Sequence, residues 1–370
     1  MIYLDYQATT PVAPEVAAAM RPWIEEKFAN PHSPSTWGRE AAAGIEVARG
    51  QVERAIGLPN GRFAFTSGAT EALNWAIKGT FERSVKRKLV TVATEHAAVL
   101  DTAEWIEGQD VTVVRLGVTP DGLLDMAAVD QAIDHATALV AVMLVNNEIG
   151  VIQQVGEIAR IAHERGSLML CDAVQGFGRM TIPEGPDLVA VSAHKIHGPK
   201  GAGGLWMRKG AEPAPLLHGG GQEQGLRSGT LSPALCVGLG EAARLSVERR
   251  DADAEHIAKL SELALATLGQ GWIVNGSLTH RYRGNLNIRR EDLDAGRLIS
   301  DLRNIAFSLG SACASGSGRP SHVLRAIGLS DHQARSSIRL GFGRYTGEEE
   351  LALACRRIDE AARSQEKFAA

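Results

Sequence analysis

Short apolar runs that alternate with amphipathic helical segments between residues 62 and 207 constrain the fold of this chain most. The runs at 62–66, 88–93, 111–115, 138–144, 167–171, 188–192 and 203–207 are predicted strands. Helical spacing predicts helices at 71–79, 99–107, 126–132 and 155–165 between them. Several of the runs are apolar throughout, which is typical of strands covered by helices on both faces. The pattern predicts an α/β large domain built on a mostly parallel seven-stranded sheet.

The remaining segments predict a second, smaller domain. A helix is predicted at 41–56, and a long helical stretch runs from residue 233 to about 268. Strand-like pieces at 272–274 and 284–288 then alternate with helices near 295–302, 322–327 and 348–362. We therefore expect an N-terminal arm (1–14) that packs with the small domain, a large domain (15–255) that contains the predicted parallel sheet, and a small α+β domain (256–370).

Composition excludes several classes of partner. The 370 residues carry a formal charge of -4, with 44% hydrophobic and 22% charged residues, as in ordinary soluble proteins. This balance gives no electrostatic case for direct nucleic-acid binding or for an anionic membrane. No apolar stretch approaches 18 residues, and the first residues lack the pattern of a signal peptide. We expect a cytoplasmic protein without a membrane partner.

A lysine follows directly after the strand predicted at 188–192. In Ser192-Ala193-His194-Lys195 it lies between small polar groups and a turn rich in glycine and proline. Lysine is depleted in strands and is rarely buried unless it is paired or covalently used. Lys195 is therefore well placed to bind an aldehyde cofactor, of which pyridoxal phosphate is the commonest. The alternative is a surface lysine in a glycine loop. Candidate partners for the same cofactor elsewhere in the sequence disfavour this alternative.

Pyridoxal phosphate also needs an acid for its pyridine nitrogen and a flat partner for its ring. Asp172 follows the apolar run 168–170, where a charge is costly unless it is paired, and a protonated pyridine would pair it. Gln175 follows shortly after and can hydrogen-bond the ring hydroxyl. His96, beyond the strand at 88–93, can stack on the ring and carry protons. The alternatives are an Asp that caps a helix and a structural His.

The segment 65–72 is a candidate phosphate site. Its strand ends in small and hydroxyl residues and opens a helix at Ala69 and Thr70. Backbone N–H groups at a helix start favour bound anions, and Ser192 and His194 can add donors. An ordinary Ser/Thr helix cap is the alternative.

Two other segments suit a small anionic substrate. Asn147 lies in a polar loop, 145–150, that can hold substrate or a cofactor oxygen. Arg339 lies among apolar residues at 336–340, where a bidentate clamp on a carboxylate is a natural use and an interdomain salt bridge is the alternative. The glycine-dense loop at 218–230 allows close approach of backbone to an anion.

The four cysteines are far apart and give neither a CxxC pair nor a zinc spacing. Cys171, Cys236 and Cys355 lie in apolar or helical surroundings and are predicted to be buried. Cys313 lies in Gly-Ser-Ala-Cys-Ala-Ser-Gly-Ser-Gly, a run of small residues that can bury almost nothing. We expect its thiol to be exposed and mobile.

Eight ordered motifs together resemble the cysteine desulfurases of the NifS/IscS-like group, which are class V aminotransferase-type enzymes of fold type I. The resemblance runs nearly end to end. The motifs are Tyr3-Leu4-Asp5-Tyr6-Gln7-Ala8-Thr9-Thr10-Pro11, Thr66-Ser67-Gly68-Ala69-Thr70-Glu71, Glu95-His96, Asn146-Asn147-Glu148-Ile149-Gly150, Asp172-Ala173-Val174-Gln175, His194-Lys195, His218-Gly219-Gly220-Gly221 with Arg227-Ser228-Gly229-Thr230, and Gly310-Ser311-Ala312-Cys313.

The resemblance implies pyridoxal phosphate as cofactor, L-cysteine as substrate and a homodimer. Lys195, Cys313 and His96 would be catalytic, and Asn147, Arg339 and Asn30 would bind substrate. The cofactor would be held by Ala69, Thr70, His96, Asn147, Asp172, Gln175, Ser192, His194 and Lys195, with Thr230 reaching across from the partner subunit.

The product sulfur would pass through a persulfide on Cys313 to a protein acceptor, such as an iron–sulfur scaffold or a thiolation enzyme. No resident metal is expected, although Cys313 is a candidate transient iron–sulfur ligand.

The sequence departs from the family at two places. One concerns the role of a local site near Pro31, and the other concerns the identity of the sulfur acceptor. Ser35 stands four residues after Pro31, where the family often has a histidine, and the sequence ends at Ala370, where family members often continue. The alternatives are a selenocysteine lyase, a class V aminotransferase, which would leave Cys313 without a role, and a catalytically silent partner protein of the same fold.

Overall fold

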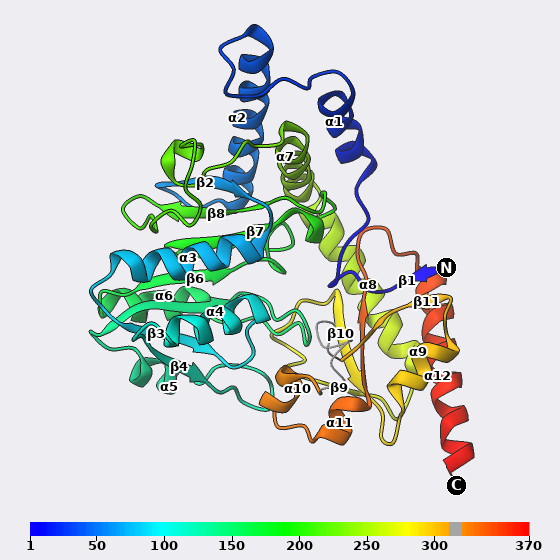
Figure 1. The fold of residues 1–370 in the computed structure, drawn as a ribbon. Helices are drawn as coiled ribbons and strands as arrows, with labels where there is room; N and C mark the ends of the chain where they lie inside the picture. The colour runs from blue at the N-terminus through cyan, green and yellow to red at the C-terminus, as the bar shows by residue number, and fades with distance from the viewer. Residues whose placement is uncertain (311–319, 370) are drawn as a thin grey trace.

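A seven-stranded sheet forms the centre of the large unit in the computed structural model, which describes residues 1–310 and 320–369 (Figure 1). The strands lie in the order β2-β8-β7-β6-β5-β3-β4. β8 is antiparallel to both of its neighbours, and every other neighbouring pair is parallel. The bounds are β2 (Gly61–Thr66), β3 (Lys88–Val92), β4 (Thr112–Leu116), β5 (Thr137–Met143), β6 (Leu168–Asp172), β7 (Leu188–Ser192) and β8 (Gly203–Arg208). The predicted fold class and all seven predicted strands are confirmed.

Helices cover both faces of this sheet, which explains why its strands are apolar without alternation. Along β5, Leu139 and Ala141 belong to the hydrophobic cluster on one face of the sheet. Val140 and Val142 belong to the hydrophobic cluster on the opposite face. The first face carries α3 (Ala69–Arg83) and α4 (Ala97–Glu107). The second carries α2 (Thr36–Ile56), α6 (Val155–Glu164) and α7 (Pro233–Glu248), and α5 (Met126–Ala132) lies beside β4.

The helical stretch from residue 233 to 268 is two helices rather than one. α7 ends at Glu248, and α8 spans Arg250–Leu268. The break is at Arg249, whose φ of -104° and ψ of 2° depart from helical geometry. A helix over residues 14–25, α1 (Pro14–Glu25), was not predicted, and it packs against α7.

The small unit contains an antiparallel four-stranded sheet in the order β12-β13-β10-β9. Its strands are β9 (Ile273–Val274), β10 (Asn285–Arg289), β12 (Ser308–Leu309) and β13 (Ser337–Gly341). The helices are α8, α9 (Ala295–Asp301), α10 (His322–Ala326), α11 (Asp331–Arg335) and α12 (Glu348–Ala369). The sequence patterns did not single out β12, β13 or α11.

The N-terminal arm lies against this small unit. β1 (Ile2–Tyr3) pairs in parallel with β11 (Ile305–Ala306), and Leu4 belongs to the small unit's core. The buried residues of α8 from Ile257 onward belong to the same core. The division at residue 255 falls within α8 and remains our proposal, and this separate core supports it.

The carboxyl ends of the parallel strands face the small unit (Figure 1). One short 3-10 turn, η1 (Ala193–Lys195), directly follows β7, and a second, η2 (Glu223–Gly225), lies beside β2, where Glu223 accepts from the Phe65 N–H. β8 begins close to the loop before α3, because a Cβ on Gly203 would lie 2.7 Å from the Cα of Gly68. Ligands of open α/β sheets bind at this edge.

Candidate active site

A cavity of about 540 Å³ lies beyond the carboxyl ends of the strands. It brings together residues from five strand ends of the large unit and from β13 of the small unit. Ten of the predicted site residues line it: Ala69, Thr70, His96, Asn147, Asp172, Gln175, Ser192, His194, Lys195 and Arg339. The sequence therefore identified most of this cavity's polar lining.

Lys195 lies at the end of η1, which turns the chain out of the sheet after β7. Its Nζ donates hydrogen bonds to the carbonyl oxygens of Gln7 and Ala8, at 2.5 and 2.7 Å. The N-terminal arm thus reaches across to the lysine amine. The sequence marks this arm as a motif but does not indicate a role for Gln7.

Arg179 holds the backbone of the same lysine. Its Nη2 donates to the Lys195 carbonyl oxygen at 2.8 Å, and its Nη1 donates to Oε1 of Gln175 at 2.6 Å. The Nε2 of Gln175 donates to the Gln7 carbonyl at 2.9 Å. This network joins the arm, the turn after β6 and η1. Arg179 had no sequence signal beyond its distance of four residues from Gln175.

Asp172 is the last residue of β6 and is 6% exposed. Its Oδ1 accepts a hydrogen bond from the backbone N–H of Val174 at 2.9 Å. Burial raises the pKa of this carboxyl, although the Val174 N–H and the charges of His96 and Lys195 act in the opposite direction. A cation beside Asp172 would stabilise its charged form.

A second buried carboxyl, Glu95, lies near Asp172. Burial and the charge of Asp172 raise the pKa of Glu95 well above its usual value. Its Oε1 accepts from the N–H of Met143 at 2.7 Å, and its Oε2 is buried without a partner among residues 1–310 and 320–365. A protonated Glu95 places no second negative charge beside Asp172.

His96 caps α4, and His194 lies in η1. The Nδ1 of His96 accepts from the backbone N–H of Ala98 at 3.1 Å, which fixes this nitrogen as the unprotonated one. Burial lowers the pKa of His96, and burial with the nearby Lys195 lowers that of His194 to about 4. Both imidazoles are therefore neutral near pH 7.

The start of α3 forms one end of the cavity. Ser67, Ala69 and Thr70 line it, and the first N–H groups of a helix have no acceptors within the helix itself. Glu71 accepts from the N–H of Ser67 at 2.8 Å and from Nε of Arg227 at 2.7 Å. The ion pair attaches the glycine-dense loop to the turn that opens the helix.

Arg339 projects from β13 of the small unit into the cavity lining and is held there by an ion pair. Its Nη2 lies 2.7 Å from Oδ1 of Asp5, which makes an ion pair between the arm and β13. Its Nη1 donates to the Asn147 carbonyl at 3.0 Å. Its side chain is 1% exposed, and its Nε is buried with no partner in the part of the chain that is described.

Three predicted site residues are not part of this cavity as described. Thr230 is exposed and Asn30 is exposed on the segment before α2, where its Oδ1 accepts from the N–H of His32. Cys313 lies outside the described residues. The other cysteines are buried, as predicted, and burial raises the pKa of Cys236 and of Cys355 to about 12.

The family model for aminotransferase class-V matches residues 2–353. A protein of Rickettsia akari described as cysteine desulfurase IscS is 42% identical over 97% of this chain and 91% of its own length. Its counterpart in Rickettsia bellii is 43% identical over 96% and 90%. Among solved structures, a NifS-like protein has a TM-score of 0.91 at 32% identity and covers 98% of this chain and 99% of its own. The structure described as SspA in complex with cysteine has a TM-score of 0.84 at 35% identity, with 94% and 100% covered.

The chain belongs to the aminotransferase class-V family. Family membership implies an enzyme that depends on pyridoxal phosphate. Within the family the chain is a cysteine desulfurase, an enzyme of sulfur mobilisation. In the described part of the chain, no helix has the length and apolar character needed to cross a membrane.

Proposed function

We propose that this chain converts L-cysteine to L-alanine in the 540 Å³ cavity and transfers the sulfur to Cys313. The observation that carries the proposal is the convergence of Lys195, Asp172 and Arg339 on one cavity. An amine, a buried acid and a buried guanidinium are the groups that an aldehyde cofactor and an amino-acid substrate require.

The donor set of the cavity fits pyridoxal phosphate. Asp172 would hold the proton on the pyridine nitrogen, and the resulting cation would favour the charged form of this buried carboxyl. The first N–H groups of α3, with Ser192 and His194, would bind the phosphate. His96 would lie against the ring, and Gln175 would reach the ring hydroxyl from its position beside Gln7. Pyridoxal phosphate supplies an aldehyde that binds amines covalently and a ring that accepts electron pairs.

The cavity's own residues would then position the substrate and move its proton. Arg339, with its unpartnered Nε, would bind the substrate carboxylate together with Asn147. Lys195 would bind the cofactor aldehyde at rest and, once displaced by the substrate amine, would take the proton from its α-carbon. Release of Nζ from the Gln7 and Ala8 carbonyls frees the amine for both tasks.

Sulfur transfer to Cys313 needs no oxidant or reductant besides the substrate and the thiolate. The thiolate of Cys313 attacks the substrate sulfur, and a sulfur–sulfur bond forms as the carbon–sulfur bond breaks. The carbon keeps the bonding electron pair and gains a proton, which yields alanine and a persulfide. Burial of the other three thiols, which raises the pKa of each, supports Cys313 as the acceptor.

The assembly and the final acceptor are also proposals. The exposed position of Thr230 suits a role in the cofactor site of a second copy. Mixing Thr230→Asp and Lys195→Ala chains should then restore activity in heterodimers, and heterodimers without activity would contradict the shared site. We propose a protein acceptor of persulfide sulfur, such as an iron–sulfur scaffold or a thiolation enzyme.

The decisive experiment measures sulfide and alanine together after L-cysteine and a reductant are added to the holoenzyme. We expect equal amounts of the two products. Cys313→Ser should keep the coloured cofactor and its spectral response to L-cysteine but release almost no sulfide, while Cys236→Ser should behave as the wild type. Turnover that requires a keto acid would instead indicate an aminotransferase, and a strong preference for selenocysteine would indicate a lyase.

A further inference from the structure

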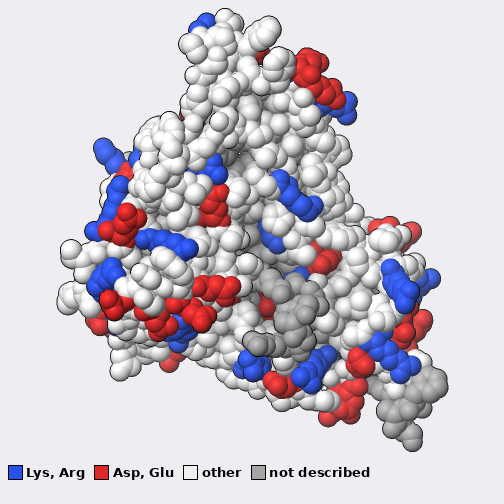
Figure 2. Space-filling view, in the orientation of Figure 1, with Lys and Arg blue, Asp and Glu red and all other residues white. Residues whose placement is uncertain are grey.

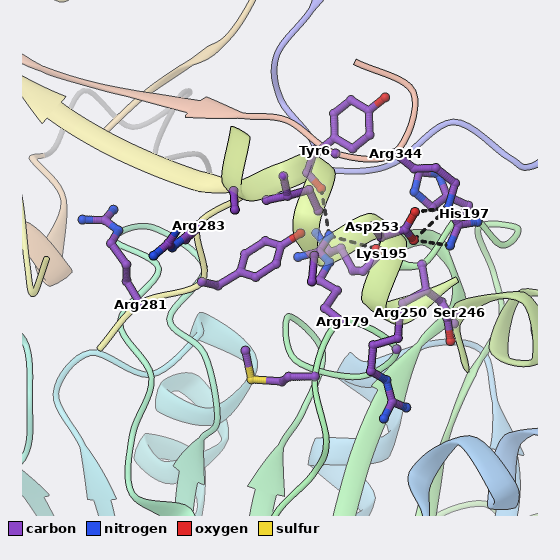
Figure 3. Close-up of a pocket in the computed structure, with 18 residues that line it drawn as sticks. Tyr6, Arg179, Lys195, His197, Ser246, Arg250, Asp253, Arg281, Arg283 and Arg344 are labelled. Atoms are coloured by element: carbon purple, nitrogen blue, oxygen red, sulfur yellow. Dashed lines mark hydrogen bonds and ion pairs between the residues drawn. The ribbon is translucent and has the colours of Figure 1, made fainter. Parts of the chain in front are cut away.

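A second cavity, of about 310 Å³, also includes Lys195 in its lining (Figure 3). Its walls come from α8, from the loop before β10 and from the residues that follow β13. Lys195 and Arg179 line it, so it lies next to the catalytic lysine, and Lys195 lines both cavities. The proposed function assigns this cavity no role.

Positive charge greatly exceeds negative charge around this second cavity. Among the described residues that line it, six are cationic and one is acidic: Arg179, Lys195, Arg250, Arg281, Arg283 and Arg344 against Asp253. Figure 3 shows Arg179, Lys195, Arg344 and Asp253 close together, with Arg281 and Arg283 at the opposite end. A bound anion would offset this excess.

Three of the guanidinium groups, those of Arg179, Arg250 and Arg281, have no carboxylate partner in the described part of the chain. Arg281 donates to the carbonyl oxygens of Ser277, Ile149 and Asn285. Burial lowers the pKa of Arg281 to about 10, which leaves it charged near pH 7. Arg179 likewise bonds carbonyl oxygens and the amide of Gln175. Charges held in this way are costly unless an anion is present.

Arg344 provides the second, independent observation. Its side chain is 8% exposed, and its Nη2 lies 2.7 Å from Oδ2 of Asp253. Its Nη1, however, is buried and has no partner among residues 1–310 and 320–365. A buried guanidinium N–H without an acceptor is destabilising, and carboxylate oxygens are its best-matched acceptors.

The remaining walls are apolar, which defines the rest of the ligand. Met180, Ile196, Ile257 and Ala258 line the cavity, and the ring of Tyr282 lies 5.0 Å from the Arg179 guanidinium. An inorganic ion would leave these walls without contacts. A carboxylate on a short hydrocarbon chain would satisfy the cations and fill the apolar part.

We propose that this cavity is a second ligand site, which binds a small organic carboxylate with a short apolar chain. The site is separate from the one that binds the amino-acid substrate. The proposal does not depend on the proposed desulfurase reaction, because binding is measured without turnover.

The test is a ligand-observed NMR titration of the holoenzyme with sodium hexanoate as the probe. We expect saturable binding with a Kd of about 1 mM or lower. Ala258→Trp, which fills the cavity, and Arg344→Lys, which keeps a cation beside Asp253 but removes the forked N–H groups, should each weaken binding at least about 10-fold. Hexanol should not bind measurably, because it lacks the charge.

Two controls locate the binding. Ala252→Trp places the same side chain on the exposed side of α8 and should bind hexanoate as the wild type does. Arg339→Ala removes the carboxylate clamp of the catalytic cavity and should also leave hexanoate binding unchanged. Absence of saturable binding, equal binding of hexanol, or loss of binding in Arg339→Ala would overturn the proposal. Should Ala258→Trp fail to fold, unchanged binding by Arg344→Lys would overturn it as well.

Discussion

Lys195 separates two cavities that differ in their balance of charge. The catalytic cavity combines cations with the buried carboxyl of Asp172 and two histidines that burial keeps neutral. The second cavity has one carboxylate, Asp253, and six cationic side chains among its described lining. On the outer face shown in Figure 2, by contrast, charges of both signs are interspersed.

The difference indicates what each cavity can do. Proton transfer needs donors and acceptors side by side, and the strand ends of the large sheet provide both. An excess of guanidinium groups with few acids favours binding of an anion and provides no base. Arg179 lines the second cavity. Its hydrogen bond to the Lys195 carbonyl also connects it to the catalytic cavity.

The largest effect is expected for Lys195→Ala, which would remove the group shared by both cavities. The purified wild type should be yellow, and its cofactor should be fixed to Lys195 by borohydride. Lys195→Ala should lose this link, and its desulfurase activity should fall about 10³-fold or more, because the proton-transfer group is lost. Absorbance spectra, peptide mass spectrometry and sulfide release measure the three outcomes.

Lys200→Ala is the matched control, because Lys200 also lines the catalytic cavity. It should keep the covalent link to the cofactor. A reduced wild type that carries the cofactor on Lys200 or Lys209 would show that the catalytic lysine has been assigned wrongly.

A smaller effect is expected for Arg179→Gln, which tests whether the second cavity supports the first. Loss of the hydrogen bond to the Lys195 carbonyl should misplace the lysine and lower kcat about 10-fold to 100-fold. KM for L-cysteine should change little, because Arg339 is the proposed partner of the substrate carboxylate. Steady-state kinetics with L-cysteine separate the two parameters.

Arg179→Lys should recover part of kcat, since an ammonium can still donate to a carbonyl oxygen. Arg250→Gln is the control, because Arg250 lines the second cavity and its Nη1 donates to the Thr181 hydroxyl. A rise in KM with unchanged kcat for Arg179→Gln would contradict the positioning role.

The residues at strand ends could be predicted from sequence, whereas their long-range partners could not. Asp172 and Lys195 each follow an apolar run, and parallel strands bring such positions to one edge of a sheet. The Gln7 carbonyl lies 188 residues from Lys195 in sequence, and no local pattern indicates that contact. The ion pair of Arg339 with Asp5 depends in the same way on how the arm packs.

Short strands and the break between two helices could not be predicted from local sequence patterns either. Arg249 separates α7 from α8 although no Gly or Pro marks the break. The residues 337–341 of β13 are buried throughout and pair with β10 and β12, a pairing set by the tertiary fold. Glu95, next to His96, was not predicted as a site residue, because the burial of a carboxyl cannot be deduced from its sequence neighbours.

The smallest effect concerns stability and compares His197, on the wall of the second cavity, with an exposed histidine. Burial, with the nearby charge of Arg344, lowers the pKa of His197 to about 4, and its φ of 67° is left-handed. His197→Asn removes the titrating group and places a residue that tolerates this φ. We expect its free energy of unfolding to depend less on pH between 6.5 and 4 than that of the wild type.

The sign follows from the protons bound in each state. Above pH 6.5 the imidazole of His197 is neutral in both the folded and the unfolded chain, so it adds no pH dependence. As the pH falls from 6.5 to 4, the unfolded chain binds a proton that the folded chain does not, and stability is lost. The full shift corresponds to about 3 kcal/mol.

Urea unfolding at several pH values measures the difference between wild type and His197→Asn. His32→Asn changes an exposed histidine and should parallel the wild type. Parallel curves for His197→Asn would mean that His197 is protonated equally in the two states, contrary to its burial in the wall of the second cavity.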